Sequence, residues 1–192
     1  RSIQRFMNKK SWILIAVARI ARSGRLGTIK RHPFVFALLC GIGVALCGLA
    51  SGDTIYGTGY TQVKASLESG VLLPWHFGLL KFAATTLSTV SGIPGGIFSP
   101  SLAVGAGLGA DAARLFPGVP LGPIMLLGMV SYFAGVVQAP ITAFVIVIEM
   151  TDNHAMVIPL MCAALIAYAT SRLICREGVY HALSKSFLRA AS

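Results

Sequence analysis

The chain has 192 residues, of which 55% are hydrophobic and only 11% are charged. Soluble domains carry about 25% charged residues, so this composition argues against a water-soluble fold and favours a protein solvated by lipid. The formal net charge is +10, but it is uneven, because nine of the 16 Lys and Arg residues lie within residues 1–31 and no acidic residue precedes Asp53.

The basic ends of the chain fit two kinds of partner, nucleic acid and the cytoplasmic surface of a membrane. No basic stripe with interleaved aromatic residues runs through a folded region, so we expect no nucleic-acid partner. A second basic group closes the chain: Arg172, Arg176, Lys185 and Arg189. The positive-inside rule therefore predicts that residues 1–31 and the C-terminus lie on the cytoplasmic side of a plasma membrane or a bacterial inner membrane.

The first 31 residues combine apolar positions at helical spacing with lysines and arginines, which predicts a basic helix and loop at the cytoplasmic surface. The membrane helices are predicted to follow over residues 33–176. The first of them is an uncharged apolar helix over residues 34–50. A polar, Gly-rich turn follows at residues 51–60, and then a short amphipathic helix over residues 61–69.

Further apolar helices are predicted over residues 77–90, 101–115, 124–137, 141–150 and 155–173. Lys81 lies inside the first of these, and we expect its ammonium group to reach the membrane surface or to pair with another group, with no part in catalysis. Gly105 and Gly109, four residues apart, predict the close approach of another helix. The Thr-Asp-Asn segment at residues 151–153 predicts a cap for the helix that follows it. A last amphipathic helix is predicted over residues 178–190.

Several of these apolar segments are too short to cross a bilayer as one helix, since a crossing takes about 20 apolar residues. Short segments broken by Gly and Pro are typical of transporters with discontinuous helices. The freed backbone groups must line a cavity or meet a ligand, because lipid cannot satisfy them. The sequence therefore predicts an all-α, multi-pass membrane protein built from tilted and broken helices.

The strongest break is the SGIPGGIFSP segment at residues 91–100, which holds two prolines and three glycines. Gly95 and Gly96 allow backbone conformations that a side chain would forbid, and a helix is expected to start within residues 97–100. The free N–H groups of its first turn, together with the helix dipole, would bind an anion without any formal charge. Glycine and proline content alone fits two interpretations equally, this anion site and a kinked helix packed against its neighbours.

The whole string resembles the ClC family of chloride channels and transporters. The GIFSP string at residues 96–100 is similar to the family's GxFxP motif, and residues 138–153 are similar to its AP…EMT segment. Tyr180, two residues after Gly178, takes the position of the family's pore tyrosine. The three motifs follow in the family's order, and the resemblance covers residues 11–189.

The resemblance implies that the backbone amides of Ile97 and Phe98 and the hydroxyl of Tyr180 face a central chloride ion. A phenol is a neutral donor, so Tyr180 would add a hydrogen bond without trapping the ion. Without the resemblance, an interfacial aromatic residue is the preferred interpretation of Tyr180. We expect bound chloride, no other cofactor and no metal. The supporting residues of the helix start are Gly95, Gly96, Ser99 and Pro100.

The resemblance also implies a fold of two inverted repeats, of which residues 1–192 would be the second, C-terminal half. The chain is expected to be part of a longer protein. Its partners would be anions, membrane lipid, the N-terminal half of the same fold and a second copy of the protein. The homodimer contact is expected through residues 141–150 and 155–173, with Ile148 and Ile158 at the interface.

The predicted function is transmembrane chloride transport, by a channel or by a proton-coupled exchanger. The alternative is a membrane scaffold with a degenerate pore that transports nothing. We do not expect an enzyme, because no Ser/His/Asp or metal-ligand cluster lies on the membrane helices. Two smaller expectations concern acidic residues: Glu149 takes a hydrogen-bonded structural role, and Asp111 pairs with Arg114.

Overall fold

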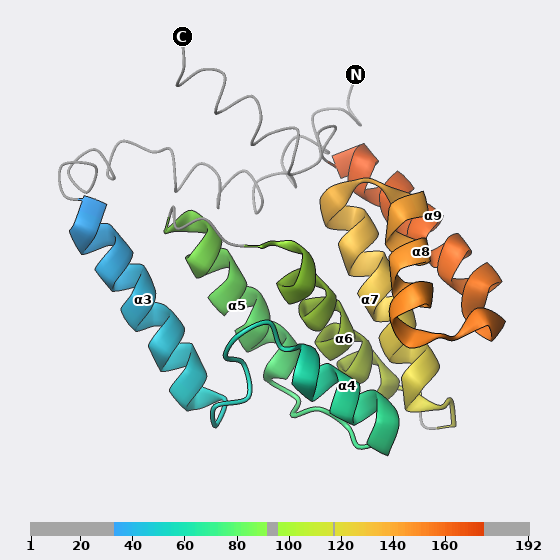
Figure 1. The fold of residues 1–192 in the computed structure, drawn as a ribbon, viewed down its shortest axis with the longest axis horizontal. Coiled ribbons are helices and arrows are strands. Elements are labelled where there is room, and N and C mark those ends of the chain that lie inside the picture. The colour runs from blue at the N-terminus through green and yellow to red at the C-terminus, as the bar shows by residue number, and fades with distance from the viewer. Residues whose placement is uncertain (1–32, 92–95, 117, 175–192) are drawn as a thin grey trace, which may run out of the picture.

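The computed structural model describes residues 33–91, 96–116 and 118–174, and every regular element within these ranges is a helix (Figure 1). The elements are α3 (Pro33–Ala50), α4 (Tyr60–Ser69), α5 (Phe77–Val90), α6 (Phe98–Ala113), α7 (Leu121–Val137), α8 (Pro140–Thr151), the 3-10 turn η2 (His154–Met156) and α9 (Val157–Ile174). The predicted all-α fold class is confirmed.

The helices differ in their capacity to cross a bilayer. Of the described segments, His154–Ile174, which joins η2 to α9, is the one that is long and apolar enough to cross by itself. The helices α7 and α8 are apolar but have only 17 and 12 residues. At the α-helical rise, α8 spans about 18 Å, well short of a hydrocarbon core of about 30 Å. The short segments of the sequence are therefore short helices in the fold.

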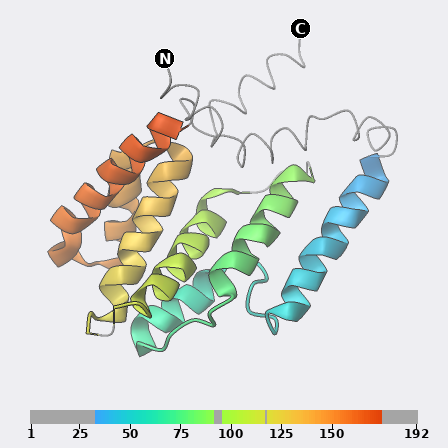
Figure 2. The same cartoon turned by 180° about the vertical axis from the view of Figure 1, so that it is seen from behind.

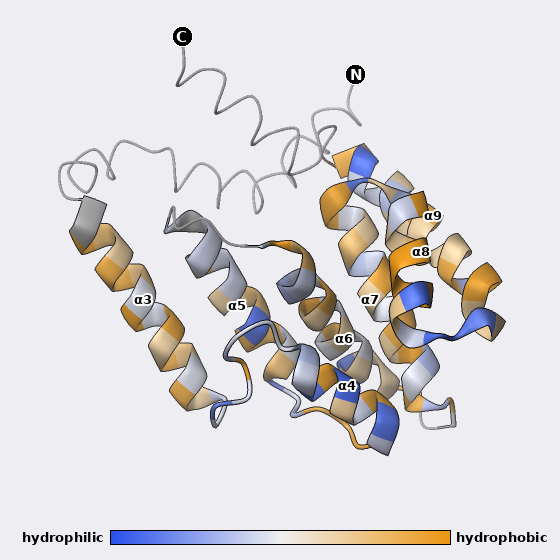
Figure 3. Ribbon diagram, in the orientation of Figure 1, coloured by the Kyte–Doolittle hydropathy of each residue, from blue (hydrophilic) through white to orange (hydrophobic). Residues whose placement is uncertain are grey.

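The helix α6 occupies the middle of the arrangement (Figures 1 and 2). It packs against α5 on one side and against α7 on the other. Beyond these, α3 packs on α5, while α8 and α9 pack on α7 and on each other. The short helix α4 lies across one end of α6 and α7. Apolar residues make up much of α3 and α9 (Figure 3), and many of their large side chains are exposed, as contact with lipid or further protein requires.

Glycines, which lack a side chain, allow α6 to lie close to both of its neighbours. A Cβ atom added to Gly105 would lie 2.6 Å from the carbonyl oxygen of Gly128 in α7. A Cβ added to Gly109 would lie 2.8 Å from the carbonyl oxygen of Ile124. On the opposite side, a Cβ added to Gly78 of α5 would lie 2.9 Å from α6 backbone. The predicted close approach at Gly105 and Gly109 is confirmed, and it lets van der Waals packing stabilise the helix pair.

The buried ammonium group of Lys81 has an unexpected role. The residue is 2% exposed, and its Nζ donates hydrogen bonds to the carbonyl oxygens of Ile55 and Gly57, each at 2.7 Å. These carbonyls lie in the loop between α3 and α4, which ends at Gly59 with a positive φ of 78°. A Cβ on Gly59 would lie 2.8 Å from the Cβ of Ala103 in α6. Lys81 does not reach the surface, and the partners with which it pairs are backbone carbonyl groups of the loop, which accept its hydrogen bonds.

The Thr-Asp-Asn segment ends α8 and supplies the N-cap residue of η2, but no side-chain cap. The Thr151 hydroxyl donates to the carbonyl of Val147 at 2.7 Å, inside α8. Asp152 follows in the left-handed conformation, with φ 48°, and its carboxylate lies 3.3 Å from Nε2 of His154. Asn153 makes no side-chain capping bond to η2. The predicted cap is therefore confirmed in position at Asn153, while Thr151 and Asp152 belong to the end of α8.

The two expectations about acidic residues had different outcomes. Asp111 pairs with Arg114 as predicted, with 3.6 Å between Oδ1 and Nε. Arg114 also donates to the carbonyl oxygen of Leu73 at 2.5 Å. Glu149 is exposed, and the structure shows no hydrogen bond or ion pair from it to any described residue. Its predicted hydrogen-bonded structural role was wrong.

Candidate anion site at the start of α6

The first turn of α6 presents backbone N–H groups without partners. Ile97 is the N-cap residue, with helical φ −85° and ψ −23°, and no side chain caps the helix. The first amides of an α-helix have no acceptor within the helix. No described residue accepts a hydrogen bond from the amides of Ile97, Phe98 or Ser99. These three donors are therefore open to a ligand at the positive end of the helix dipole.

The sequence explains why the helix starts here. Pro100 occupies the third helical position, where its missing N–H costs nothing because no partner is available for it. The carbonyl oxygen of Ile97 accepts two hydrogen bonds, one from the Ser101 amide at 3.1 Å and one from the Ser101 hydroxyl at 2.6 Å. Carbonyl groups point along the helix towards its C-terminus, so these bonds leave the N–H groups facing the opposite way.

An aromatic contact fixes the first turn against α7. The ring of Phe98 meets the ring of Phe133 edge to face, with 4.9 Å between the ring centres and an interplanar angle of 85°. Phe133 is 3% exposed, so this contact belongs to the core. Together with the glycine contacts further along α6, it packs the helix against its neighbours, and a preorganised binding site requires such support.

The structure brings five of the seven predicted site residues together at the start of α6: Gly96, Ile97, Phe98, Ser99 and Pro100. Gly95 and Tyr180 lie outside the described residues, so their roles stay predictions. Gly96 is exposed, and the other four are half-buried. Within the described ranges, no three His, Cys, Asp or Glu side chains gather as metal ligands would.

Two residues that support the site were missed in the sequence. Ser101 lies four positions after Ile97, and a serine at that spacing in a helix can donate to the earlier carbonyl. The sequence therefore contained a pattern that could have predicted this hydrogen bond. Phe133 lies on another helix, 35 positions from Phe98, and no sequence pattern links the two rings. Only the packing of α6 on α7 identifies it.

Comparison with known proteins identifies the family of this chain. Residues 11–172 match the family model for the voltage gated chloride channel. An H(+)/Cl(−) exchange transporter ClcA from Yersinia pestis bv. Antiqua (strain Angola) is 32% identical over 151 residues, 76% of this chain and 31% of the transporter. A ClcA from Vibrio vulnificus (strain YJ016) is 37% identical over 115 residues, 55% of this chain and 25% of the transporter.

The chain spans between a quarter and a third of the length of the curated relatives it matches. The matched region contains every described helix up to the last residues of α9, and it includes the uncapped start of α6. The chain belongs to the voltage gated chloride channel family, whose members are integral membrane proteins.

Proposed function

We propose that this chain supplies part of a transmembrane chloride pathway and that the anion binds at the start of α6. The observation that carries this proposal is the uncapped first turn with its three free amides, on a helix that packs against α5 and α7. The similar proteins named above are H(+)/Cl(−) exchange transporters, which supports chloride as the anion.

A neutral site suits transport better than a buried cation would. The helix start offers a partial charge of about +0.5 and a few hydrogen-bond donors. A full positive charge in the low-dielectric interior would hold a halide far more strongly and slow its release. Since the donors belong to the backbone, they stay in place while the ion arrives and leaves.

The rest of the protein would complete the site. We propose that these helices form the second of two inverted repeats and that the N-terminal half supplies the facing helix starts. The positive-inside rule supports a cytoplasmic location for residues 1–31 and for the C-terminus. Both of these segments lie outside the described residues.

Chloride efflux from liposomes tests the proposed function. The full-length protein should release chloride in preference to a large organic anion such as gluconate. A folded, correctly inserted protein that carries no anion flux would favour the alternative, a membrane scaffold with a degenerate pore. Proton uptake measured in the same vesicles distinguishes an exchanger from a channel.

Removal of one backbone donor should weaken chloride binding sharply. Incorporation of phenyllactic acid in place of Phe98 replaces the N–H by an ester oxygen and keeps the ring. A hydrogen bond to an ion is worth about 1.5–3 kcal/mol, so the chloride Kd should rise about 10- to 150-fold. Calorimetric titration of the full-length protein measures the change. The same replacement at Phe116, which is 60% exposed and lies beyond α6, should leave the Kd unchanged.

Tyr180 should tune chloride binding without supporting the fold. Tyr180→Phe removes one neutral hydrogen bond, which corresponds to about 0.5–1.5 kcal/mol of binding free energy. The chloride affinity should fall modestly, and the thermal stability should stay nearly unchanged. Tyr56→Phe, in an exposed loop position, is the matched control. A large loss of stability with unaltered chloride affinity would identify Tyr180 as an interfacial anchor.

We propose that α8 and α9 form the contact between two copies of the protein. Bulky apolar side chains stand exposed on both helices: Ile141, Val145, Ile158 and Ile166. Such faces also suit lipid, so the family resemblance carries most of the weight. Ile148, in contrast, is 6% exposed and buried within the chain, so the expectation that it lies at the interface was wrong.

Cysteine crosslinking checks this interface in a background without native cysteines. Ile158→Cys should give a covalent dimer, because this side chain is 70% exposed on α9. Ile148→Cys is the control and should give none. A full-length protein that stays monomeric in mild detergent, or equal crosslinking at the two positions, would refute the proposed contact.

A further inference from the structure

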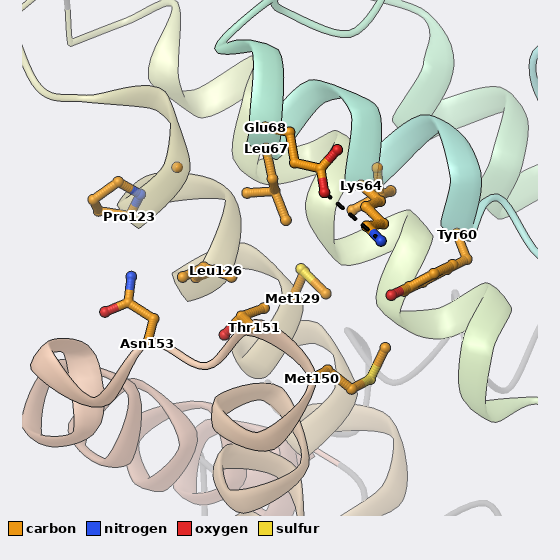
Figure 4. Close-up of a pocket in the computed structure, with 12 residues that line it drawn as sticks. Tyr60, Lys64, Leu67, Glu68, Pro123, Leu126, Met129, Met150, Thr151 and Asn153 are labelled. Atoms are coloured by element: carbon orange, nitrogen blue, oxygen red, sulfur yellow. Dashed lines mark ion pairs between the residues drawn. The ribbon is translucent and has the colours of Figure 1, made fainter.

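A pocket of about 340 Å³ lies between α4, the first turn of α7 and the end of α8 (Figure 4). Its wall is apolar and belongs to the core, since Val63, Leu126 and Met129 are each 3% exposed. Leu67 and Met150 complete this wall. The volume is at the lower end of the range for ligand sites, about 300–1,000 Å³. Methionine side chains adapt well to flexible apolar ligands.

The rim of the pocket carries one positive and one negative side chain. Lys64 and Glu68 of α4 form an ion pair at 3.7 Å, with side chains 56% and 68% exposed. Figure 4 shows the Lys64 ammonium and the Tyr60 hydroxyl both directed towards the middle of the pocket. An exposed pair of this kind contributes at most about 1 kcal/mol, so it opens readily for a ligand.

The pocket lies at one end of the helix bundle. The first turn of α7 and the end of α8 meet there, beneath the short helix α4. Two exposed aromatic residues lie in the loops that flank α4, Tyr56 at 43% and Trp75 at 69% exposure. Aromatic residues concentrate at the depth of the lipid headgroups. The opening of the pocket is thus within reach of a lipid headgroup.

We propose that this pocket binds a zwitterionic phospholipid of the phosphatidylethanolamine class. Glu68 accepts hydrogen bonds from the headgroup ammonium, Lys64 donates to the phosphate, and the Tyr60 hydroxyl donates to a phosphate or ester oxygen. One acyl chain enters the apolar wall. The paired charges of the rim favour this lipid, because an anionic headgroup would meet the Glu68 carboxylate and a cationic one would meet Lys64.

Native mass spectrometry of the delipidated full-length protein tests this proposal. The protein is titrated with phosphatidylethanolamine and, separately, with phosphatidylglycerol that has the same acyl chains. The wild type should retain phosphatidylethanolamine about fivefold more strongly, as expected from one extra exposed ionic contact. Leu126→Trp fills the pocket and should lower this retention to the level of phosphatidylglycerol. Leu46→Trp, at a position 60% exposed on α3, is the matched control and should not change it.

A second variant covers the case in which Leu126→Trp does not fold. The double substitution Lys64→Met and Glu68→Gln alters only exposed rim side chains, and it should abolish the preference between the two lipids. Soluble glycerophosphoethanolamine should not displace the lipid, because it lacks the acyl chain. Displacement by it, equal retention of the two lipids by the wild type, or unchanged retention by either pocket variant would overturn the proposal. Failure of the wild type to bind either lipid would overturn it too. Other parts of the full-length protein would then occupy the pocket.

Discussion

Gly128→Val should strongly destabilise the fold and greatly lower the yield of folded protein. A Cβ at Gly128 would lie 2.8 Å from the Cα of Gly109 and would also meet the carbonyl oxygen of Gly105. Both obstacles are backbone atoms, so α6 and α7 must separate. Overpacking costs about 1–3 kcal/mol where side chains can move and more where they cannot, so we expect a loss above about 3 kcal/mol. Thermal denaturation in detergent and the yield of monodisperse protein measure the loss.

Gly41→Val is the matched control for this prediction. It places the same side chain in a helix, α3, at a glycine whose added Cβ would have nothing within 4 Å. Its effect should be small and slightly stabilising, because valine has a higher helix propensity than glycine, by less than about 1 kcal/mol. Equal stability of the two variants would show that the close contact of α6 and α7 does not support the fold.

Lys81→Met should destabilise the protein by about 2–4 kcal/mol. Methionine matches the length of lysine but cannot donate to the carbonyl oxygens of Ile55 and Gly57, which would lose their partner. Part of this loss of stability is offset, because the variant no longer buries a charged group. Thermal denaturation measures the loss, and proteolysis within the loop between α3 and α4 reports whether that loop has detached.

Lys64→Met makes the same chemical change at an exposed position of α4. Its ion pair with Glu68 is worth at most about 1 kcal/mol, so its effect should be small. If Lys81→Met were as stable and as resistant to proteolysis as Lys64→Met, the ammonium group of Lys81 would not be what holds the loop.

The helices themselves could be predicted from the sequence, because uncharged apolar segments bounded by Gly and Pro have few alternatives. The helix predicted over residues 77–90 has the bounds of α5. The start of α6 was also predictable, since Gly96 readily interrupts a helix and Pro100 is well tolerated in a helix's first turn. The amide donors of the candidate site follow from that start alone.

The contacts between helices could not be predicted, because they depend on partners far along the chain. The carbonyl groups that Lys81 meets are 24 and 26 positions away, in a loop whose fold no local pattern specifies. Ile148 and Ile158 lie in similar apolar segments, yet one is buried and the other exposed. In a helix that is apolar all round, periodicity does not reveal the buried face.

We propose that the start of α6 binds the transported anion. The most direct measurement is anomalous diffraction from crystals of the full-length protein soaked in bromide, which reports halide positions independently of flux. We predict a bromide peak within hydrogen-bonding reach of the Ile97 and Phe98 amide nitrogens. Bromide bound elsewhere in the protein, with no peak at the start of α6, would contradict the account.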